Sequence, residues 1–342
     1  MRLVTFILCI LFFASCHCNQ TKESRKSTNQ LQVIVAEKSF IELGGQKQYV
    51  EITSESNKNP VLLFLHGGPG WPQTPQLRYF NSDLTKTFTL VAWDQSGCGK
   101  SYLNDSVPKN LSLNQIINDA HELTQILKQK FHQSKIYLAG YSWGSIVGMH
   151  LAEKYPEDYL IYVGISQVIN MKKGIIISRE WIAQKAKEKS DSETLKILSR
   201  LNTSDKTLCN SDLECFILQY GLLNKYNGAI YDPNSEKDEE KSMKAYKDYE
   251  NYDWNKGFQF SAQHLEKDMF STDLTYIKRL QLPVIFFQGR HDWNVPSVLV
   301  EEFEKNLIAP KKSIVWFEKS GHGLLIEEAS NFNKLMISEL TQ

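Results

Sequence analysis

The sequence predicts an α/β fold in which a mostly parallel sheet is flanked by helices and covered by a mainly helical cap. Short apolar runs rich in β-branched and aromatic residues alternate with helical patterns along much of the chain. This alternation is typical of a parallel sheet with helices on both faces. Residues 170–275 interrupt it with helices and loops before a further strand, which is typical of an inserted cap.

The expected elements begin with an antiparallel hairpin over residues 32–53, which turns at Gly44 and Gly45. The apolar runs that follow have the length and composition of strands, and the amphipathic patterns between them indicate helices. Strands are therefore expected at 61–65, 88–93, 136–139, 160–165, 284–288 and 314–317, and helices at 113–131, 146–155 and 332–340.

The chain divides into a core, residues 31–169 and 276–342, and the cap, residues 170–275. An insertion that returns to a sheet strand is expected to cover the carboxyl edge of the sheet, where open α/β sheets bind ligands. Within the cap, residues 234–250 are heavily charged and are expected to form a solvated helix or loop. The aromatic residues of the cap suit either an apolar substrate or the cap's own core.

The N-terminus has the features of an export signal. Arg2 precedes an apolar run over residues 3–13, which is shorter than the roughly 20 residues that span a bilayer. "FFASC" resembles a bacterial lipoprotein signal, in which Cys16 becomes the lipidated first residue; ordinary secretion with cleavage near Cys16–Cys18 is the alternative. Residues 1–18 are therefore expected to be a signal peptide and 19–30 a flexible tether. The protein would be anchored at the cell envelope, or otherwise periplasmic or secreted.

Charge and cysteine content narrow the possible partners. The 39 Lys and Arg residues balance the 39 Asp and Glu residues, so the sequence does not predict a phosphate-binding surface for nucleic acid. Export implies an oxidising compartment, where Cys209 and Cys215 are close enough in sequence to close a small disulfide loop. Two buried thiols are the alternative for this pair. Cys98 lies in a glycine turn without an obvious partner.

The stretch "GYSWG" places Ser142 between two glycines where an expected strand becomes a helix. In a Gly-x-Ser-x-Gly turn the serine sits on a sharp, strained bend that exposes its hydroxyl above the sheet. The following helix N-terminus and the backbone N–H of Trp143 point into the same space. This arrangement predicts that Ser142 is a nucleophile.

A serine nucleophile needs a base and an acid that orients the base, and in this kind of fold they follow in the order acid, histidine. Asp292, in "FQGRHDWNVP", and His322, in "FEKSGHG", each follow an expected strand. The other histidines lie in the leader, on or beside helices ahead of the acid, in the cap, or next to Asp292. We therefore expect Asp292 and His322 to complete a triad with Ser142.

The loop "LHGGPG" after the strand at 61–65 is expected to contribute to an oxyanion hole. Glycines let backbone N–H groups approach a ligand closely, and we assign the two donors to the amides of Gly68 and Trp143. His66, Gly67 and Pro69 are expected to support this loop, His66 through hydrogen bonds rather than proton transfer. A phosphate-binding loop is disfavoured because no Gly-Lys-Ser/Thr follows.

Together, "HGGPG", "WDQSGCGKS", "GYSWGS" and the late Asp and His resemble the proline iminopeptidase-like branch of the α/β-hydrolase superfamily, from about Val33 onward. The resemblance implies a serine hydrolase with no metal and no organic cofactor, and adds Asp94 to the supporting residues. Proline iminopeptidases release an N-terminal proline from peptides. This chain has Ser96 where the family usually has Arg, and Tyr141 before the nucleophile where Gly is common.

The expected function is an exported serine hydrolase that cleaves small amides or esters, of the aminopeptidase type. A carboxylesterase acting on small apolar esters is one alternative, and a non-catalytic binding lipoprotein on the same fold is another. An aminopeptidase must bind a substrate ammonium, and a buried cation needs a carboxylate partner. The partner would be a small molecule or short peptide, with the membrane contacted only through a lipid anchor. The carboxylate candidates in the cap are Glu180, Glu214, Glu250, Asp253 and Glu266.

Overall fold

The computed structural model of the chain describes residues 35–102, 111–203, 207–250 and 252–341. The expected signal peptide and tether, including Cys16, lie outside the described residues. Within the described ranges, every helix is too short or too polar to cross a membrane.

The described residues form one sheet of eight strands in the order β1-β2-β4-β3-β5-β6-β7-β8. The β1–β2 hairpin and the β2–β4 pair are antiparallel, and every other neighbouring pair is parallel. The prediction of a mostly parallel sheet is confirmed. The strands are β1 (Val35–Leu43), β2 (Gln46–Ser54), β3 (Val61–Leu65), β4 (Thr89–Trp93), β5 (Ile136–Tyr141), β6 (Tyr159–Ile165), β7 (Val284–Gly289) and β8 (Lys312–Phe317).

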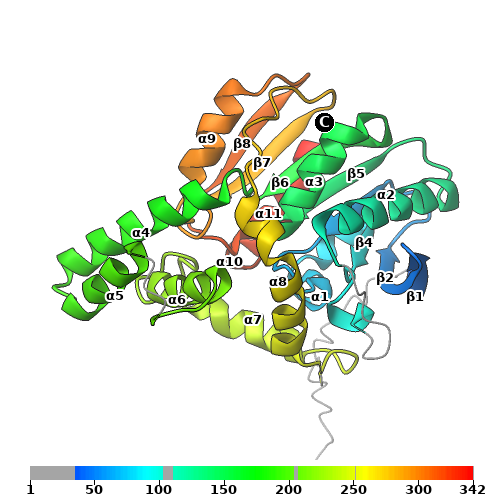
Figure 1. Ribbon diagram of the computed structural model, residues 1–342. Helices are drawn as coiled ribbons and strands as arrows, with labels where there is room; N and C mark the ends of the chain where they lie inside the picture. The colour runs from blue at the N-terminus through cyan, green and yellow to red at the C-terminus, as the bar shows by residue number, and fades with distance from the viewer. Residues whose placement is uncertain (1–34, 103–110, 204–206, 251, 342) are drawn as a thin grey trace, which may run out of the picture. The chain divides into compact units, whose positions relative to one another are not determined.

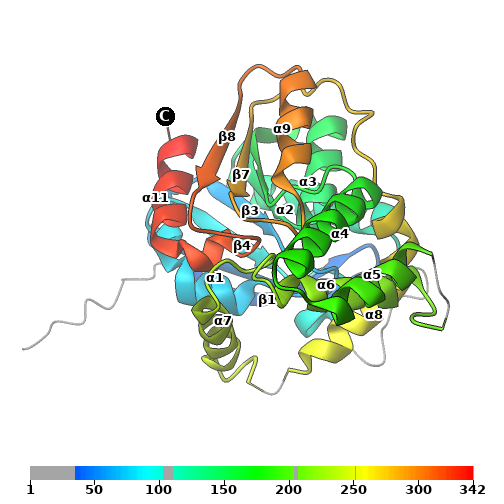
Figure 2. The same cartoon turned by 90° about the vertical axis from the view of Figure 1, so that its left-hand side faces the viewer.

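Helices cover both faces of the sheet, which explains why its central strands are continuously apolar. All five residues of β3 are buried: Leu63 and Leu65 pack on one face, and Leu62 and Phe64 on the other. Figure 2 shows α11 on the opposite side of the sheet from α3 and α9. The first face packs α2 (Leu113–Lys130), α3 (Trp143–Lys154) and α9 (Ser297–Asn306), and the second α1 (Thr74–Phe80), α10 (Leu324–Glu327) and α11 (Ala329–Leu340).

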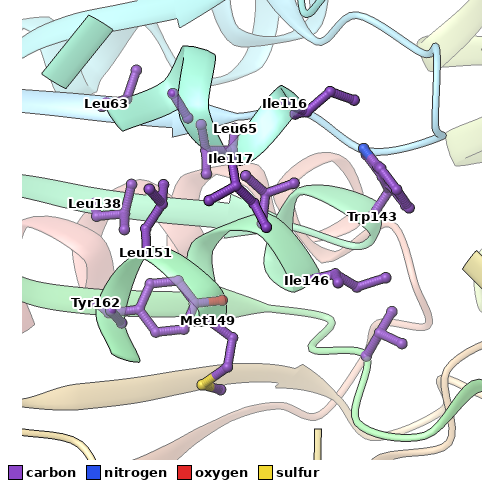
Figure 3. Packing of buried hydrophobic residues seen from close by; sticks show 14 of the residues in the cluster. Leu63, Leu65, Ile116, Ile117, Leu138, Trp143, Ile146, Met149, Leu151 and Tyr162 are labelled. Carbon is purple, nitrogen blue, oxygen red and sulfur yellow. The ribbon is translucent and has the colours of Figure 1, made fainter. Parts of the chain in front are cut away.

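The core between β3, β5 and α3 fixes the start of α3 against the sheet. Leu65, Leu138, Trp143 and Ile146 belong to one buried cluster, drawn in Figure 3. A buried leucine or tryptophan of this kind stabilises the fold by roughly 2 kcal/mol or more. The turn between β5 and α3, which contains Ser142, is therefore supported by packed side chains on both sides.

The described residues of the inserted segment between β6 and β7 form five helices, and Figure 1 shows them gathered at one end of the sheet. The two ends of this segment meet at a bridge between Asn170 and Asp273. Asn170, Asp191, Ser211 and Asp253 each cap a helix by accepting a backbone N–H. The helices are α4 (Met171–Glu188), α5 (Ser192–Asn202), α6 (Asp212–Asn224), α7 (Asn234–Lys244) and α8 (Trp254–Ser271).

A disulfide joins Cys209 to Cys215, with the Cα atoms 5.3 Å apart. It connects the segment before α6 to the first turn of that helix. Cys98 is a buried thiol. The inserted segment also has a core of its own, in which Trp181 and Tyr226 pack with the aliphatic residues of α4, α5 and α6.

The expectation that residues 234–250 form a solvated segment is wrong for part of this range. The Asp248 carboxylate accepts hydrogen bonds from Arg78, at 2.8 Å, and from Lys100, at 2.6 Å. Tyr249 is buried and donates its hydroxyl to Asp94 at 2.7 Å. The end of this segment is therefore docked on the core through Asp248 and Tyr249.

Candidate active site

Ser142 lies at the sharp turn between β5 and α3, and its backbone is strained. Its φ of 52° falls in the left-handed region, which is unfavourable for a residue with a side chain. A Cβ at Gly144 would collide with the backbone oxygen of Leu65, and one at Gly140 with the backbone of Gly144. Glycine is therefore required on both sides of Ser142, and this explains the spacing seen in the sequence.

The structure brings Ser142, His322 and Asp292 into one chain of hydrogen bonds. Ser142 Oγ lies 2.9 Å from His322 Nε2, and His322 Nδ1 lies 2.8 Å from Asp292 Oδ2. Asp292 follows β7 and His322 follows β8, and both side chains are buried. A histidine held in this way by a carboxylate can remove a proton from a serine hydroxyl.

Two further contacts position the acid and the base. The other Asp292 oxygen accepts the backbone N–H of Val295 at 2.8 Å. The His322 backbone N–H donates to the carbonyl of Ala229, in the inserted segment, at 2.6 Å. The loop carrying His322 is therefore fixed by the inserted segment as well as by the sheet.

The loop after β3 lies beside Ser142, and its histidine holds it in place. His66 Nδ1 donates to the carbonyl of Gly67 at 2.8 Å, and Nε2 accepts the backbone N–H of Gln95 at 3.0 Å. Burial lowers the pKa of His66 to about 4, so the ring is neutral and each nitrogen keeps one role. Gly68, joined to Pro69 by a cis peptide bond, lines the same cavity as Trp143.

Asp94 is fully buried and has no contact with the triad. It accepts hydrogen bonds from the Thr74 hydroxyl at 3.0 Å, the Tyr249 hydroxyl at 2.7 Å and the backbone N–H of Lys100 at 2.9 Å. It therefore joins the glycine turn after β4 to the docked segment that follows α7. Burial raises its pKa from 3.8 to about 6, and the three hydrogen bonds oppose that rise.

The raised pKa of Asp94 predicts a pH-dependent contribution to stability. Between pH 4 and pH 6 the folded protein holds a proton on Asp94 that the unfolded chain has released, so this contribution is lost as the pH rises. The unfolding free energy of wild type relative to Asp94→Asn should therefore fall by about 2 kcal/mol from pH 4 to pH 7. Urea denaturation of both proteins at each pH measures this difference in unfolding free energy. A difference that stays constant or rises with pH would contradict the raised pKa of Asp94.

A cavity of about 360 Å³ opens over Ser142 between the core and the inserted helices. Its walls are mainly apolar and aromatic, as expected of a site for a small molecule. Phe216 and Tyr220 of α6 line it, whereas Trp181 and Tyr226 belong to the inserted segment's own core, against which Tyr220 also packs. The aromatic residues of the segment are thus divided between the two roles considered from the sequence.

Glu239 of α7 also lines the cavity, and it was not predicted from the sequence. Burial raises the pKa of this carboxyl, while the Trp71 indole and the Gln76 amide nearby act to lower it. The Gln76 side chain is fully buried, yet its amide completes no hydrogen bond to any described residue. Glu239 thus places a carboxylate on the cavity wall, where it is available to a group that donates protons.

The five carboxylates considered from the sequence lie outside this cavity, so that prediction is wrong. Glu180 and Glu250 are exposed to solvent. The other three accept backbone N–H groups that position helices or their ends: Glu214 from Asn210, Asp253 from Lys256 and Glu266 from Leu213. Their residue type suited an ammonium site, but their hydrogen-bonding capacity is used for local structure.

Another acid near the triad, Glu327 of α10, is likewise occupied. Its carboxylate accepts the backbone N–H groups of Tyr231 and Gly321 at 2.8 Å and of Asp232 at 3.0 Å. It therefore ties the inserted segment to the loop of His322. No group of three or more His, Cys, Asp and Glu side chains within the described ranges is placed to hold a metal ion.

Comparison with known proteins places these features in a family. Residues 60–329 match the family model of the alpha/beta hydrolase fold. The chain is 32% identical over 297 residues to a probable aminopeptidase, YbaC, of Bacillus subtilis, covering 85% of this chain and 92% of that protein. It is 25% identical over 300 residues to the proline iminopeptidase of Heyndrickxia coagulans, covering 86% and 94%. The structure of proline iminopeptidase from Mycobacterium smegmatis superposes with a TM-score of 0.64 at 17% identity, covering 89% and 97%.

Proposed function

Because the chain belongs to the alpha/beta hydrolase fold family, we propose that it is an exported serine hydrolase that removes the N-terminal residue from short peptides. Family membership and the peptidase names of its relatives make it a hydrolase. The observation that supports the aminopeptidase assignment is Glu239, a carboxylate without a basic partner in the cavity over Ser142.

In the proposed mechanism, His322 Nε2 takes the Ser142 proton as Oγ bonds to the substrate carbonyl carbon. The backbone N–H groups of Gly68 and Trp143 stabilise the resulting oxyanion, and Asp292 holds the imidazolium in place. His322 then protonates the leaving amine as the C–N bond breaks, which leaves an acyl-enzyme. Water attacks the ester carbonyl and His322 accepts its proton. His322 then returns this proton to Ser142 Oγ as the C–Oγ bond breaks, which releases the acid product.

The substrate's ammonium group is assigned to Glu239 because the neighbouring carboxylates already have partners. Asp292 is hydrogen-bonded to the His322 ring and to the backbone N–H of Val295. Glu327 accepts hydrogen bonds from three backbone N–H groups. No described Lys or Arg forms an ion pair with Glu239, so a bound ammonium would supply its counter-charge.

A carboxylesterase is the second candidate, because the cavity walls are largely apolar and would suit a short ester. The two functions differ in whether the substrate needs a positive charge. The test compares prolyl arylamide with its N-acetylated form and with a butyrate ester. We expect the free amine to be cleaved and acetylation to lower kcat/KM by about 100-fold, the effect of losing a charged partner worth roughly 3 kcal/mol. An unchanged rate after acetylation, or turnover of the ester alone, would refute the aminopeptidase assignment.

We also propose that the protein is attached to the envelope through a lipid on Cys16. Small residues precede Cys16 after the apolar run, and the Cys209–Cys215 disulfide fits an oxidising compartment. Several acyl chains would hold it firmly, because each buried CH₂ contributes roughly 0.8 kcal/mol. Growth with labelled fatty acid should label the wild type and leave Cys16→Ser unlabelled. Recovery of unlabelled wild type from the periplasm or medium would overturn this assignment.

A further inference from the structure

We propose that Tyr141 determines the size of the acyl group that the cavity accepts, by restricting the first residue of the substrate to a small side chain. This inference rests on the proposed function, because it uses the positions of Ser142 and Glu239 to orient the substrate. Tyr141 is the last residue of β5, directly before Ser142, and it lines the cavity.

The Tyr141 ring lies between the loop after β3 and the base of the triad. A Cβ on Gly67 would stand 3.1 Å from Cδ1 and 3.3 Å from Cε1 of this ring, so the ring packs directly on that loop. On its other side, its centroid lies 5.3 Å from that of the His322 ring, with an angle of 35° between the planes. The ring is thus held on the cavity wall, beside the histidine that is bonded to Ser142.

Tyr141 and Glu239 line the same cavity, so the tyrosine ring shares that space with the proposed ammonium site. Burial raises the pKa of its hydroxyl well above the ordinary value, and the nearby Glu239 carboxyl and Tyr220 hydroxyl raise it further. The hydroxyl makes no hydrogen bond to another described residue. A substrate with its carbonyl at Ser142 and its ammonium at Glu239 therefore places its first side chain against this ring.

Removing the ring should open space on the acyl side of the cavity. The same cavity is also lined by Tyr220 and by the apolar side chains of Ile230 and Ile326. A prolyl or alanyl residue needs little room there, whereas a phenylalanyl residue needs the volume that the Tyr141 ring fills. A substrate group that exceeds its pocket by one or more methylenes lowers kcat/KM about tenfold or more.

The experiment measures kcat/KM of Tyr141→Ala for prolyl and phenylalanyl arylamides. We expect the phenylalanyl-to-prolyl ratio to rise at least tenfold over wild type, and to stay within about threefold in Tyr141→Phe, which keeps the ring. The matched control is Tyr137→Ala, which removes a ring from the same strand; its hydroxyl bonds to the carbonyl of Leu340, away from the cavity. That variant should lose thermal stability without changing the ratio.

An unchanged ratio in folded Tyr141→Ala would overturn the inference. Should that variant fail to fold, Tyr141→Leu is assayed in its place, and an unchanged ratio there has the same meaning. A wild type that cleaves no arylamide would refute the proposed function separately. In that case the limit on acyl size is measured as the ratio of kcat/KM for a hexanoate ester to that for an acetate ester. This ratio should still rise in Tyr141→Ala, and its failure to rise would overturn the inference.

Discussion

Replacing Ser142 by alanine should lower kcat/KM by at least about 10⁴-fold on every substrate that the protein cleaves. In the proposed mechanism Oγ forms the acyl bond, and water in its place has neither its position nor its 2.9 Å contact with His322. Alanine keeps the Cβ that the backbone already tolerates at φ 52°, so the fold should be retained. Initial rates and circular dichroism on the same preparation measure both effects.

The matched control for this variant is Ser271→Ala, which removes an exposed hydroxyl at the end of α8. Its activity should equal that of wild type. Near wild-type turnover by Ser142→Ala would show that another group is the nucleophile, and the mechanism would then be wrong.

Replacing Glu239 by glutamine should lower kcat/KM for prolyl arylamide about 100-fold and leave butyrate ester hydrolysis within about twofold. Glutamine keeps the size of the side chain and removes its charge, so a bound ammonium loses a partner worth roughly 3 kcal/mol. The ester has no ammonium and should not respond. Steady-state kinetics on the two substrates give the comparison within one protein preparation.

Glu240→Gln is the control, since Glu240 is the exposed neighbour of Glu239 on the same helix. It should match wild type on both substrates. An equal loss of both activities in Glu239→Gln would indicate a structural role for that residue. No loss on the arylamide would remove the proposed ammonium site.

The central strands of the sheet could be predicted from the sequence because burial on both faces makes them continuously apolar. The strand expected at residues 61–65 coincides with β3, whose five residues are all buried. Ser142, Asp292 and His322 could be selected for a related reason. Each follows a strand, and the carboxyl ends of parallel strands meet at one edge of the sheet.

The inserted segment was less predictable, because its contacts depend on how it docks rather than on a repeating pattern. Residues 234–250 carry the composition of a solvated segment, yet Asp248 and Tyr249 are held by Arg78 and Asp94 of the core. Charge density alone cannot distinguish a carboxylate that faces water from one that faces a distant arginine.

Glu239 was missed for the same reason, although a weak signal was present. Glu239, Ser242 and Met243 are spaced three and four residues apart, so they fall on one side of α7, and all three are at least partly shielded from solvent. Among the surrounding charged residues, one methionine and one serine are too few to mark an inward face. The position of Glu239 beside Trp71 and Gln76 follows from tertiary contacts, which no local pattern encodes.

The central claim, that Ser142 is an activated nucleophile, is tested most directly by labelling the folded protein with a fluorophosphonate probe and locating the adduct by mass spectrometry. The account predicts one adduct per chain on the peptide that contains Ser142, and no adduct on Ser142→Ala. Folded wild type that stays unlabelled, or a label that persists in Ser142→Ala, would contradict it and favour a non-catalytic binding protein built on the same fold.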